Sequence, residues 1–393
     1  MQDTVGRLTT PEFALIATCA RWPWTPALSA KALEQAAKVQ DWPRFLALVD
    51  QQRVAGLISN AIKEAGVVLP ADIAAEITER ARENGLQEII FVSETVRLTK
   101  LLQQAGLTVT VLKGASIAMK IFGRFGVRYS MDIDLMVAKT DVAAASDILL
   151  RAGYVRVEPE PDASAKTMRA RLSRYKDMVF EHPGNGSLIE LHWRLFQNPF
   201  LLRGAERART VPLTLSGTTV QILPDGLFEL YLCAHGAEHA WARLKWLADL
   251  GALIGQGQSD AETLYAQARR RGLKRLVGPG LLLCRDLFET PVPAAVEREV
   301  LKDWRMRWLY RTAWSSMIGD EDGAELEDRS LATARKNLGH YLSSNDPRYW
   351  LSELRYDLLD TSSSSEGGLK RVLMLTKRLF SLGRSTAPIE AKS

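Results

Sequence analysis

The chain has 393 residues, 46% of them hydrophobic, so it is long enough to form two or three buried cores. Its formal net charge of +5 is small for this length and permits contact with nucleic acid without requiring it. No apolar run reaches the roughly 18 residues of a membrane-spanning helix, and the first residues lack the basic and apolar parts of a signal peptide. Three scattered cysteines form neither a zinc pattern nor a disulfide framework. These features predict a soluble, cytoplasmic protein.

Residues 1–94 are predicted to form an N-terminal helical region. Prolines separate short segments, and apolar residues recur at helical spacing in 54–63 and 73–82. A longer helix is expected from residue 70 towards residue 104, and it would lead into a first strand over 107–112. This region is therefore predicted to be a helical platform for the part of the chain that follows.

Two carboxylates one residue apart, Asp132 and Asp134, lie inside an apolar run. Alternate residues of a strand point to the same face, so these two would lie side by side while Ile133 and Leu135 face the core. Like charges at such short range persist most readily where a cation lies between them. Oxygen ligands that leave room for water and for a substrate phosphate suit magnesium. The pattern therefore predicts a metal-dependent phosphate chemistry.

A third carboxylate, Glu190, lies in a second strand-like run over residues 187–193. The preceding run, 177–182, ends in the turn-forming residues 183–186, which predicts a hairpin. Glu190 and His192 would share one face of the second strand. The sequence thus predicts an acid and an imidazole next to the metal-binding face.

The remaining chain is predicted to continue the sheet and then to become helical. A helix is expected over 141–152, a strand over 154–157 and a closing hairpin over 213–223, which completes a mixed domain at residues 95–225. Residues 226–361 are predicted to be a C-terminal helical domain with a core of its own.

Several charged segments lie outside the acid pattern. Asp249 is expected to be a surface acid, with an ion pair to Arg243, Lys245 or a site histidine as the alternative. The basic residues within 169–176 are expected to form a solvated helix face, with contact to a phosphate backbone or a membrane surface as the alternative. Residues 362–393 are predicted to be a flexible linker and a basic amphipathic helix over 369–380. That helix could rest weakly on an anionic membrane or a partner, or dock back on the protein.

Several motifs together resemble the uncharacterised nucleotidyltransferase family of the DNA-polymerase-beta-like superfamily. The similar residues are Lys113 and Gly114 after the first strand, Arg128, the acid pair, and the Glu-Leu-His-Trp run that begins at Glu190. The resemblance covers roughly residues 95–225. It implies an α+β fold in which a small mixed sheet of five strands or fewer, with helices, is flanked by N-terminal and C-terminal helical regions.

The resemblance also implies a function and a set of site residues. Asp132, Asp134 and Glu190 would be catalytic and would hold two Mg²⁺ ions, one activating an attacking hydroxyl and one neutralising the departing pyrophosphate. A nucleoside triphosphate, with ATP favoured, would be the substrate. Its nucleotide-binding residues would be Lys113, Gly114, Ser116 and Arg128.

The acceptor of the nucleotide is not encoded in any motif. A protein side chain, a small molecule and an RNA end remain open, and the flanking helices would hold whichever it is. The sequence shows no P-loop, protein-kinase or dinucleotide-binding signature.

Other interpretations of these residues remain open. The acid pair could guard an edge strand, Lys113 and Arg128 could be solvated charges, and Ser116 could be a helix cap. His192 is equally consistent with a structural histidine and a site residue. A catalytically silent nucleotide-binding regulator of the same fold is the main functional alternative.

A separate motif, His235 to His239, spells the H-x-x-E-H signature of some zinc hydrolases. Its spacing on a helix is correct, but no third ligand has a clear position. Because proteins of the resembled family often have histidines in the helix after the third acid, His235 and His239 are instead candidates for a supporting role near the site, together with His192. Zinc hydrolysis is the less favoured alternative.

Overall fold

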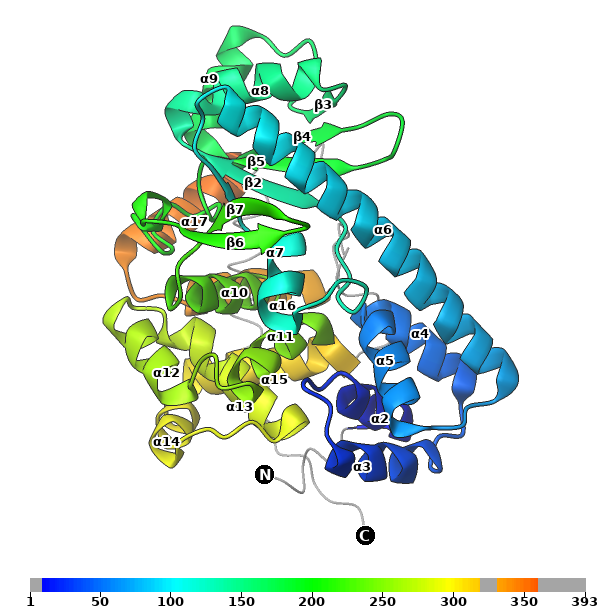
Figure 1. Cartoon of the computed structure of the whole chain (residues 1–393). Helices are drawn as coiled ribbons and strands as arrows, with labels where there is room; N and C mark the ends of the chain where they lie inside the picture. Colours follow the sequence, from blue (N-terminus) through cyan, green and yellow to red (C-terminus); the bar gives the residue numbers. More distant parts are fainter. Residues whose placement is uncertain (1–8, 319–330, 360–393) are drawn as a thin grey trace.

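Three of the four short N-terminal helices have a proline in their first turn. The computed structural model describes residues 9–318 and 331–359, and opens with α2 (Pro11–Cys19), α3 (Pro26–Ala36), α4 (Trp42–Gln52) and α5 (Ala55–Ala65) (Figure 1). A proline occupies the first turn of α2, α3 and α4, where its missing N–H is not needed. Several prolines that separate segments in the sequence therefore mark helix starts.

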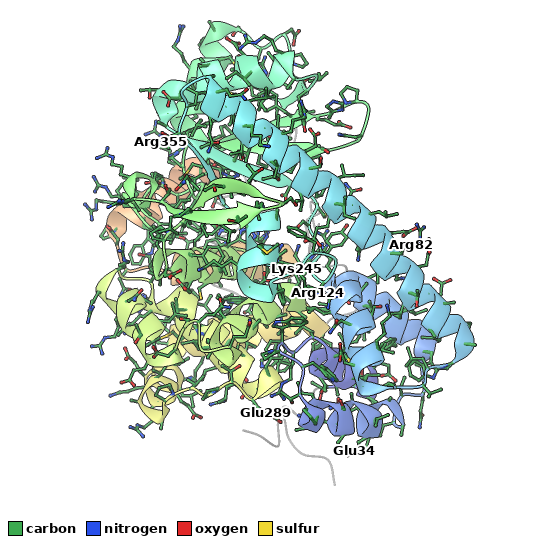
Figure 2. All side chains as sticks on the ribbon, in the orientation of Figure 1. Glu34, Arg82, Arg124, Lys245, Glu289 and Arg355 are labelled. Atoms are coloured by element: carbon green, nitrogen blue, oxygen red, sulfur yellow. The ribbon has the colours of Figure 1, made fainter. Side chains whose placement is uncertain are left out.

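The long helix α6 (Ala71–Gln104) connects two cores. Its first half contributes Ile73 and Ile77 to the core of the N-terminal helices, and its second half contributes Leu98 and Leu102 to the core under the sheet. Its outer face carries ion pairs such as that of Arg82 with Glu79 (Figure 2). With about 1.5 Å of rise per residue it spans about 50 Å. The helical platform and the sheet are therefore linked by one continuous element.

One mixed sheet lies at the centre of the fold. Its strand order is β3-β4-β5-β2-β1-β7-β6. The strands are β1 (Val109–Val111), β2 (Ile133–Val137), β3 (Val155–Glu158), β4 (Asp177–Glu181), β5 (Leu188–His192), β6 (Val211–Leu215) and β7 (Thr218–Ile222). The α+β class predicted from the sequence is confirmed.

The sheet is larger than the five strands or fewer that the resemblance implies, since the described residues contain seven. The additional size comes from the β6–β7 hairpin, which pairs in parallel with β1, and from β3, which pairs with the outer edge of β4. The added strands provide hydrogen-bond partners for the backbone groups of β1 and β4, which would otherwise lie at open edges of the sheet. Between β2 and β3 runs α8 (Val142–Arg151), and α9 (Ala165–Arg174) precedes β4.

Helices follow the sheet through the rest of the described chain. They are α10 (Leu227–Glu238), α11 (Leu244–Gly255), α12 (Ala261–Arg270), α13 (Lys274–Phe288), α14 (Ala294–Lys302), α15 (Trp304–Ile318), α16 (Leu331–Leu342) and α17 (Pro347–Leu359). None of the helices in the described ranges is both long and apolar enough to span a membrane. The linker and basic helix predicted for residues 362–393 lie outside the described residues.

The C-terminal helices do not have the separate core that the sequence predicts. Their apolar side chains form one cluster with those of α2 to α5, because the two helical groups pack directly against each other. Gln52 joins them through buried polar bonds: its Nε2 donates to Met317 O at 2.9 Å, and its Oε1 accepts from Leu244 N at 2.7 Å. The N-terminal platform and the C-terminal helices are therefore one packed unit beneath the sheet.

Candidate active site

Three carboxylates meet where β2 and β5 lie side by side. The strands are parallel, and their register pairs Asp134 with Glu190. Asp132 lies just before β2, and its side chain is 28% exposed, whereas that of Asp134 is fully buried. Ile133 and Leu135 belong to the core, as the alternation predicts. The structure therefore brings together the three acids that the sequence singles out.

Two lysines neutralise the acids. Lys113 Nζ lies 3.0 Å from both Asp132 Oδ2 and Asp134 Oδ1. Lys176 Nζ lies 3.1 Å from Glu190 Oε2 and also pairs with Asp177. Lys176 follows the end of α9, so the expectation that it lies on a solvated helix face is wrong. In the sequence, the position of Lys176 directly before the predicted strand over 177–182 indicates that it can lie near Glu190.

His192 lies between two of the acids. Its Nε2 is 3.0 Å from Asp134 Oδ1 and 3.0 Å from Glu190 Oε2, and its Nδ1 is 3.3 Å from Arg194 O. Burial lowers the pKa of His192 and Lys176 acts in the same direction, but the hydrogen bonds to the two acids outweigh both and raise that pKa to about 9. The imidazolium therefore donates to both carboxylates at neutral pH.

The acids differ in how readily they ionise. Burial raises the pKa of Asp134 to about 6, helped by Asp132 and Glu190, although Lys113 acts in the opposite direction. Burial also opposes ionisation of Glu190, but Lys113, His192 and Lys176 hold its pKa well below its usual range. The site is thus a dense network in which each charge is set by its neighbours.

The donor atoms fit a divalent cation. Asp134 Oδ2 is buried and has no hydrogen-bond partner among the described residues, which is unusual for a carboxylate oxygen. Ligand atoms of Asp134, Glu190 and His192 lie within 4.8 Å of one another. Carboxylate oxygens suit magnesium, whereas the imidazole nitrogen is a softer ligand. Asp132, Asp134 and Glu190 are therefore the residues that fit Mg²⁺ best.

Gly114 has the backbone conformation that the motif requires, with φ +70°. A Cβ at this position would lie 3.4 Å from Asp132 O, so the strain of the left-handed region is the main reason for glycine. The helix that follows is short: α7 (Ala115–Ile117) passes into the π-helical turn η1 (Ala118–Phe122). Ser116 is fully buried, and its Oγ donates to Lys113 O at 3.4 Å.

Arg128 is held by Asp249 on α11. Its Nε lies 2.9 Å and 3.1 Å from the two Asp249 oxygens, and its Nη2 lies 2.9 Å from Asp249 Oδ2. Its Nη1 donates to Ser130 Oγ at 3.1 Å. Asp249 is 2% exposed, so the prediction that it lies at the surface is wrong. Its negative charge compensates the buried guanidinium of Arg128. All three nitrogens of Arg128 thus bond the protein itself.

The H-x-x-E-H histidines lie side by side without a metal-binding set. His235 is in α10 and His239 ends it; their rings are 4.8 Å apart, and that of His239 stacks on Trp246 at 4.9 Å. Burial holds the pKa of both imidazoles well below the usual range. Among the described residues, the trio that offers three ligand atoms is Asp134, Glu190 and His192, and it contains neither histidine. The zinc motif therefore lacks its third ligand there.

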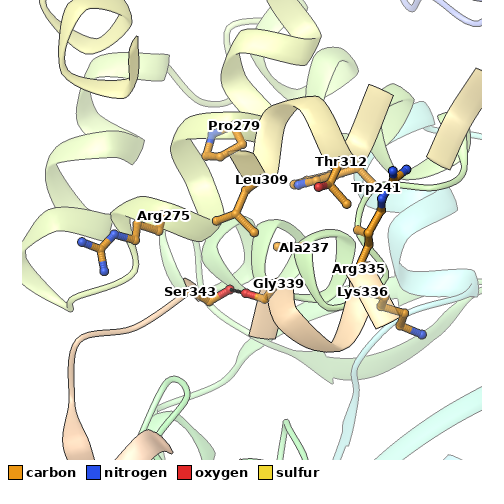
Figure 3. A pocket seen from close by; sticks show the side chains of 11 residues that line it. Ala237, Trp241, Arg275, Pro279, Leu309, Thr312, Arg335, Lys336, Gly339 and Ser343 are labelled. Atoms are coloured by element: carbon orange, nitrogen blue, oxygen red, sulfur yellow. Dashed lines mark hydrogen bonds between the residues drawn. The ribbon is translucent and has the colours of Figure 1, made fainter. Parts of the chain in front are cut away.

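A hollow between α10, α13, α15 and α16 is not the nucleotide site (Figure 3). Trp241, Pro279, Leu309 and Lys336 are among its lining residues, and its volume is about 20 Å³. That is room for about one water molecule. This hollow is therefore too small to hold a nucleotide.

The mixed sheet carries Asp134 on β2 and Glu190 on the adjacent β5, with Asp132 directly before β2. The chain belongs to the uncharacterised nucleotidyltransferase family, whose sequence pattern matches residues 38–289. That match is wider than the 95–225 of the motif resemblance and takes in helices on both sides of the sheet. The family unit therefore includes part of the helical platform and α10 to α13.

Comparison with solved structures gives a distant similarity. An antigenic nucleotidyltransferase-like protein from Paracoccidioides brasiliensis is similar over 53% of this chain and 96% of that chain, with 14% identity and a TM-score of 0.32. No curated protein matches the sequence.

Proposed function

We propose that this protein is a magnesium-dependent nucleotidyltransferase that moves a nucleoside monophosphate from a nucleoside triphosphate, ATP being favoured, to an acceptor. The observation that supports this most directly is the convergence of Asp134 on β2, Glu190 on the adjacent β5 and Asp132 directly before β2. One buried oxygen of Asp134 has no hydrogen-bond partner among the described residues. Lys113, Lys176 and His192 offset part of the repulsion among the three carboxylates, and the unpartnered Asp134 oxygen remains available to a cation. A protein that only binds nucleotide would gain less from three neighbouring carboxylates than a metal-dependent transferase does.

Asp132, Asp134 and Glu190 would hold Mg²⁺, which supplies Lewis-acid activation of the acceptor oxygen and neutralises the departing pyrophosphate. The acceptor oxygen forms a bond to the α-phosphorus while the bond from that phosphorus to the bridging oxygen breaks. Pyrophosphate leaves with the electron pair, and the acceptor proton is released to water. Glu190 suits this role because its depressed pKa keeps it ionised.

The remaining residues would orient the reactants. Lys113 exchanges its bonds with Asp132 and Asp134 for triphosphate oxygens, and Gly114 allows the backbone to approach the phosphates. Ser116 is proposed as a neighbour of the nucleotide that acts through Lys113 O, to which it donates. Arg128 is a positioning residue, because its guanidinium fixes the segment before Asp132 against α11.

The histidines divide into two groups. His192 is proposed to orient Asp134 and Glu190 through its hydrogen bonds. His235 and His239 are proposed to support the site from α10, where His235 stacks on Tyr231 at 6.2 Å. The acceptor stays open between a protein side chain, a small molecule and an RNA end.

Pyrophosphate release tests this proposal. The variants Asp132→Asn and Glu190→Gln are expected to lose at least about 100-fold in rate, because each removes a ligand charge from the proposed metal site. Asp225→Asn is the matched control, since Asp225 pairs with Lys120 and its side chain is 78% exposed. Wild-type release by either site variant contradicts the proposal. Binding of nucleotide without release by the wild type favours the silent regulator.

A further inference from the structure

Lys245 is a buried amine without a counter-ion. It lies in α11, is 9% exposed, and forms no ion pair or hydrogen bond with any residue in ranges 9–318 and 331–359. Its polar contacts are with aromatic rings: Nζ lies 5.6 Å from the centre of the Tyr129 ring and 5.7 Å from that of Trp246. Burying an amine without a hydrogen-bonded partner is costly, so such a position calls for a reason.

The charges around Lys245 are mostly positive. Burial lowers its pKa to about 7, and Arg128, Arg53 and Lys113 act in the same direction, against the attraction of Asp132. Arg53 also shares a ring with it, because the guanidinium carbon of Arg53 lies 5.4 Å from the centre of the Tyr129 ring. Arg128 and Lys113 have acidic partners in Asp249, Asp132 and Asp134, whereas Lys245 has no ion-pair partner among the described residues.

The fold holds this amine in place. Asp249 lies one helical turn after Lys245 on α11 and binds Arg128. The helix that carries Lys245 is therefore fixed to the segment that carries Asp132. The position is rigid and internal, as expected for a binding group and not for a solvated lysine.

We propose that Lys245 is an anion-binding residue that takes a phosphate group of the substrate next to the acid site. A phosphate group supplies the counter-charge that the protein does not, and it would lie within reach of an amine already placed at low exposure. This inference rests on the proposed function. The phosphate comes from the nucleoside triphosphate or from a phosphorylated acceptor, and both share this chemistry.

Equilibrium binding separates the two sources. The probes are the α,β-methylene analogue of ATP with magnesium, which prevents transfer, inorganic triphosphate, and orthophosphate. The proteins are the full chain, Lys245→Met, which keeps the length and removes the charge, and Lys245→Arg, which keeps the charge. Lys120→Met is the matched control, because Lys120 also lies over a ring, that of Phe228 at 5.3 Å, but pairs with Asp225.

The Lys245→Met variant is expected to weaken binding of the analogue and of inorganic triphosphate by roughly 10- to 100-fold, the size of a lost charge-assisted hydrogen bond. Lys245→Arg restores part of the loss, and Lys120→Met binds like the wild type. A loss confined to orthophosphate also supports the inference and assigns the site to the acceptor. Wild-type affinity of Lys245→Met for all three probes overturns it.

Failure of the proposed function would look different. If the wild type transfers no nucleotide but binds inorganic triphosphate through Lys245, the anion site stands and the transferase does not. If the wild type transfers nucleotide and Lys245→Met binds every probe normally, the transferase stands and the anion site does not.

Discussion

The buried ion pair of Arg128 and Asp249 determines how firmly the acid segment is held against α11. The two side chains are 6% and 3% exposed, and three nitrogen-to-oxygen contacts of 2.9 to 3.1 Å join them. Removing one partner of such a pair leaves an uncompensated buried charge, which costs about 3–5 kcal/mol of unfolding free energy. Asp249→Asn keeps the shape and one acceptor, so a loss near 3 kcal/mol is expected.

A double-mutant cycle isolates the interaction. Arg128→Met leaves the Asp249 carboxylate buried, and burial already raises its pKa, so this variant is expected to recover some stability as pH falls and the carboxyl group takes up a proton. The cycle is closed by the single variant Asp249→Leu and the double variant Arg128→Met/Asp249→Leu, which replaces the pair with apolar groups. It should be more stable than the sum of the two single losses predicts, by about 2 kcal/mol or more.

Urea unfolding at pH 7, followed by circular dichroism, gives these free energies. Asp225→Asn is the control, because its exposed pair with Lys120 is worth about 1 kcal/mol or less. The reasoning is refuted if Asp249→Asn loses less than about 1 kcal/mol. Additive losses in the double variant would refute it as well, because they would show that the two charges do not depend on each other.

Three further variants test the packing and charge behind the site. Gly56→Ala would place a Cβ 2.5 Å from Gly126 O, so urea unfolding should show a loss of about 1–3 kcal/mol. In Gly85→Ala the added Cβ would lie 3.9 Å from its nearest neighbour, the Cα of Gly126. The same assay should therefore show a gain of up to about 1 kcal/mol in unfolding free energy, because alanine favours a helix more than glycine does. Equal effects of the two substitutions would contradict this. Burial raises the pKa of Glu88 from its ordinary value of 4.5 to about 7. The folded state therefore keeps a proton that the unfolded state releases, and this contribution to stability falls as pH rises from about 4.5 to 7. Glu88→Gln should therefore gain about 3 kcal/mol over the wild type at pH 8 and little at pH 4.5, and a gain independent of pH would argue against it.

The acid site could be predicted from the sequence because its pattern is local. Asp132 and Asp134 lie in one apolar run, and strand alternation separates them from Ile133. Glu190 follows turn-forming residues that lie between two strand-like runs, and this pattern predicts a hairpin. The parallel register that pairs Asp134 with Glu190 is a property of the folded sheet and is not encoded in either run alone.

What the sequence did not predict depends on contacts between distant parts of the chain. Arg128 and Asp249 are 121 residues apart, and an acid within an apolar helix gives no sign of its partner. The place of Lys245 depends on the same packing of α11. The hairpin over 213–223 is predicted from its local pattern, but its parallel pairing with β1 through β7 is not.

The most direct test of nucleotidyl transfer follows two labels. Each of the four nucleoside triphosphates is supplied with magnesium and a lysate as source of acceptors, labelled once on the α-phosphate and once on the γ-phosphate. Nucleotidyl transfer predicts that the α label is retained on an acceptor and the γ label appears in pyrophosphate, and that both are lost in an Asp134→Asn variant with a wild-type unfolding midpoint. Transfer of the γ label to the acceptor, or unchanged labelling by Asp134→Asn, would contradict it.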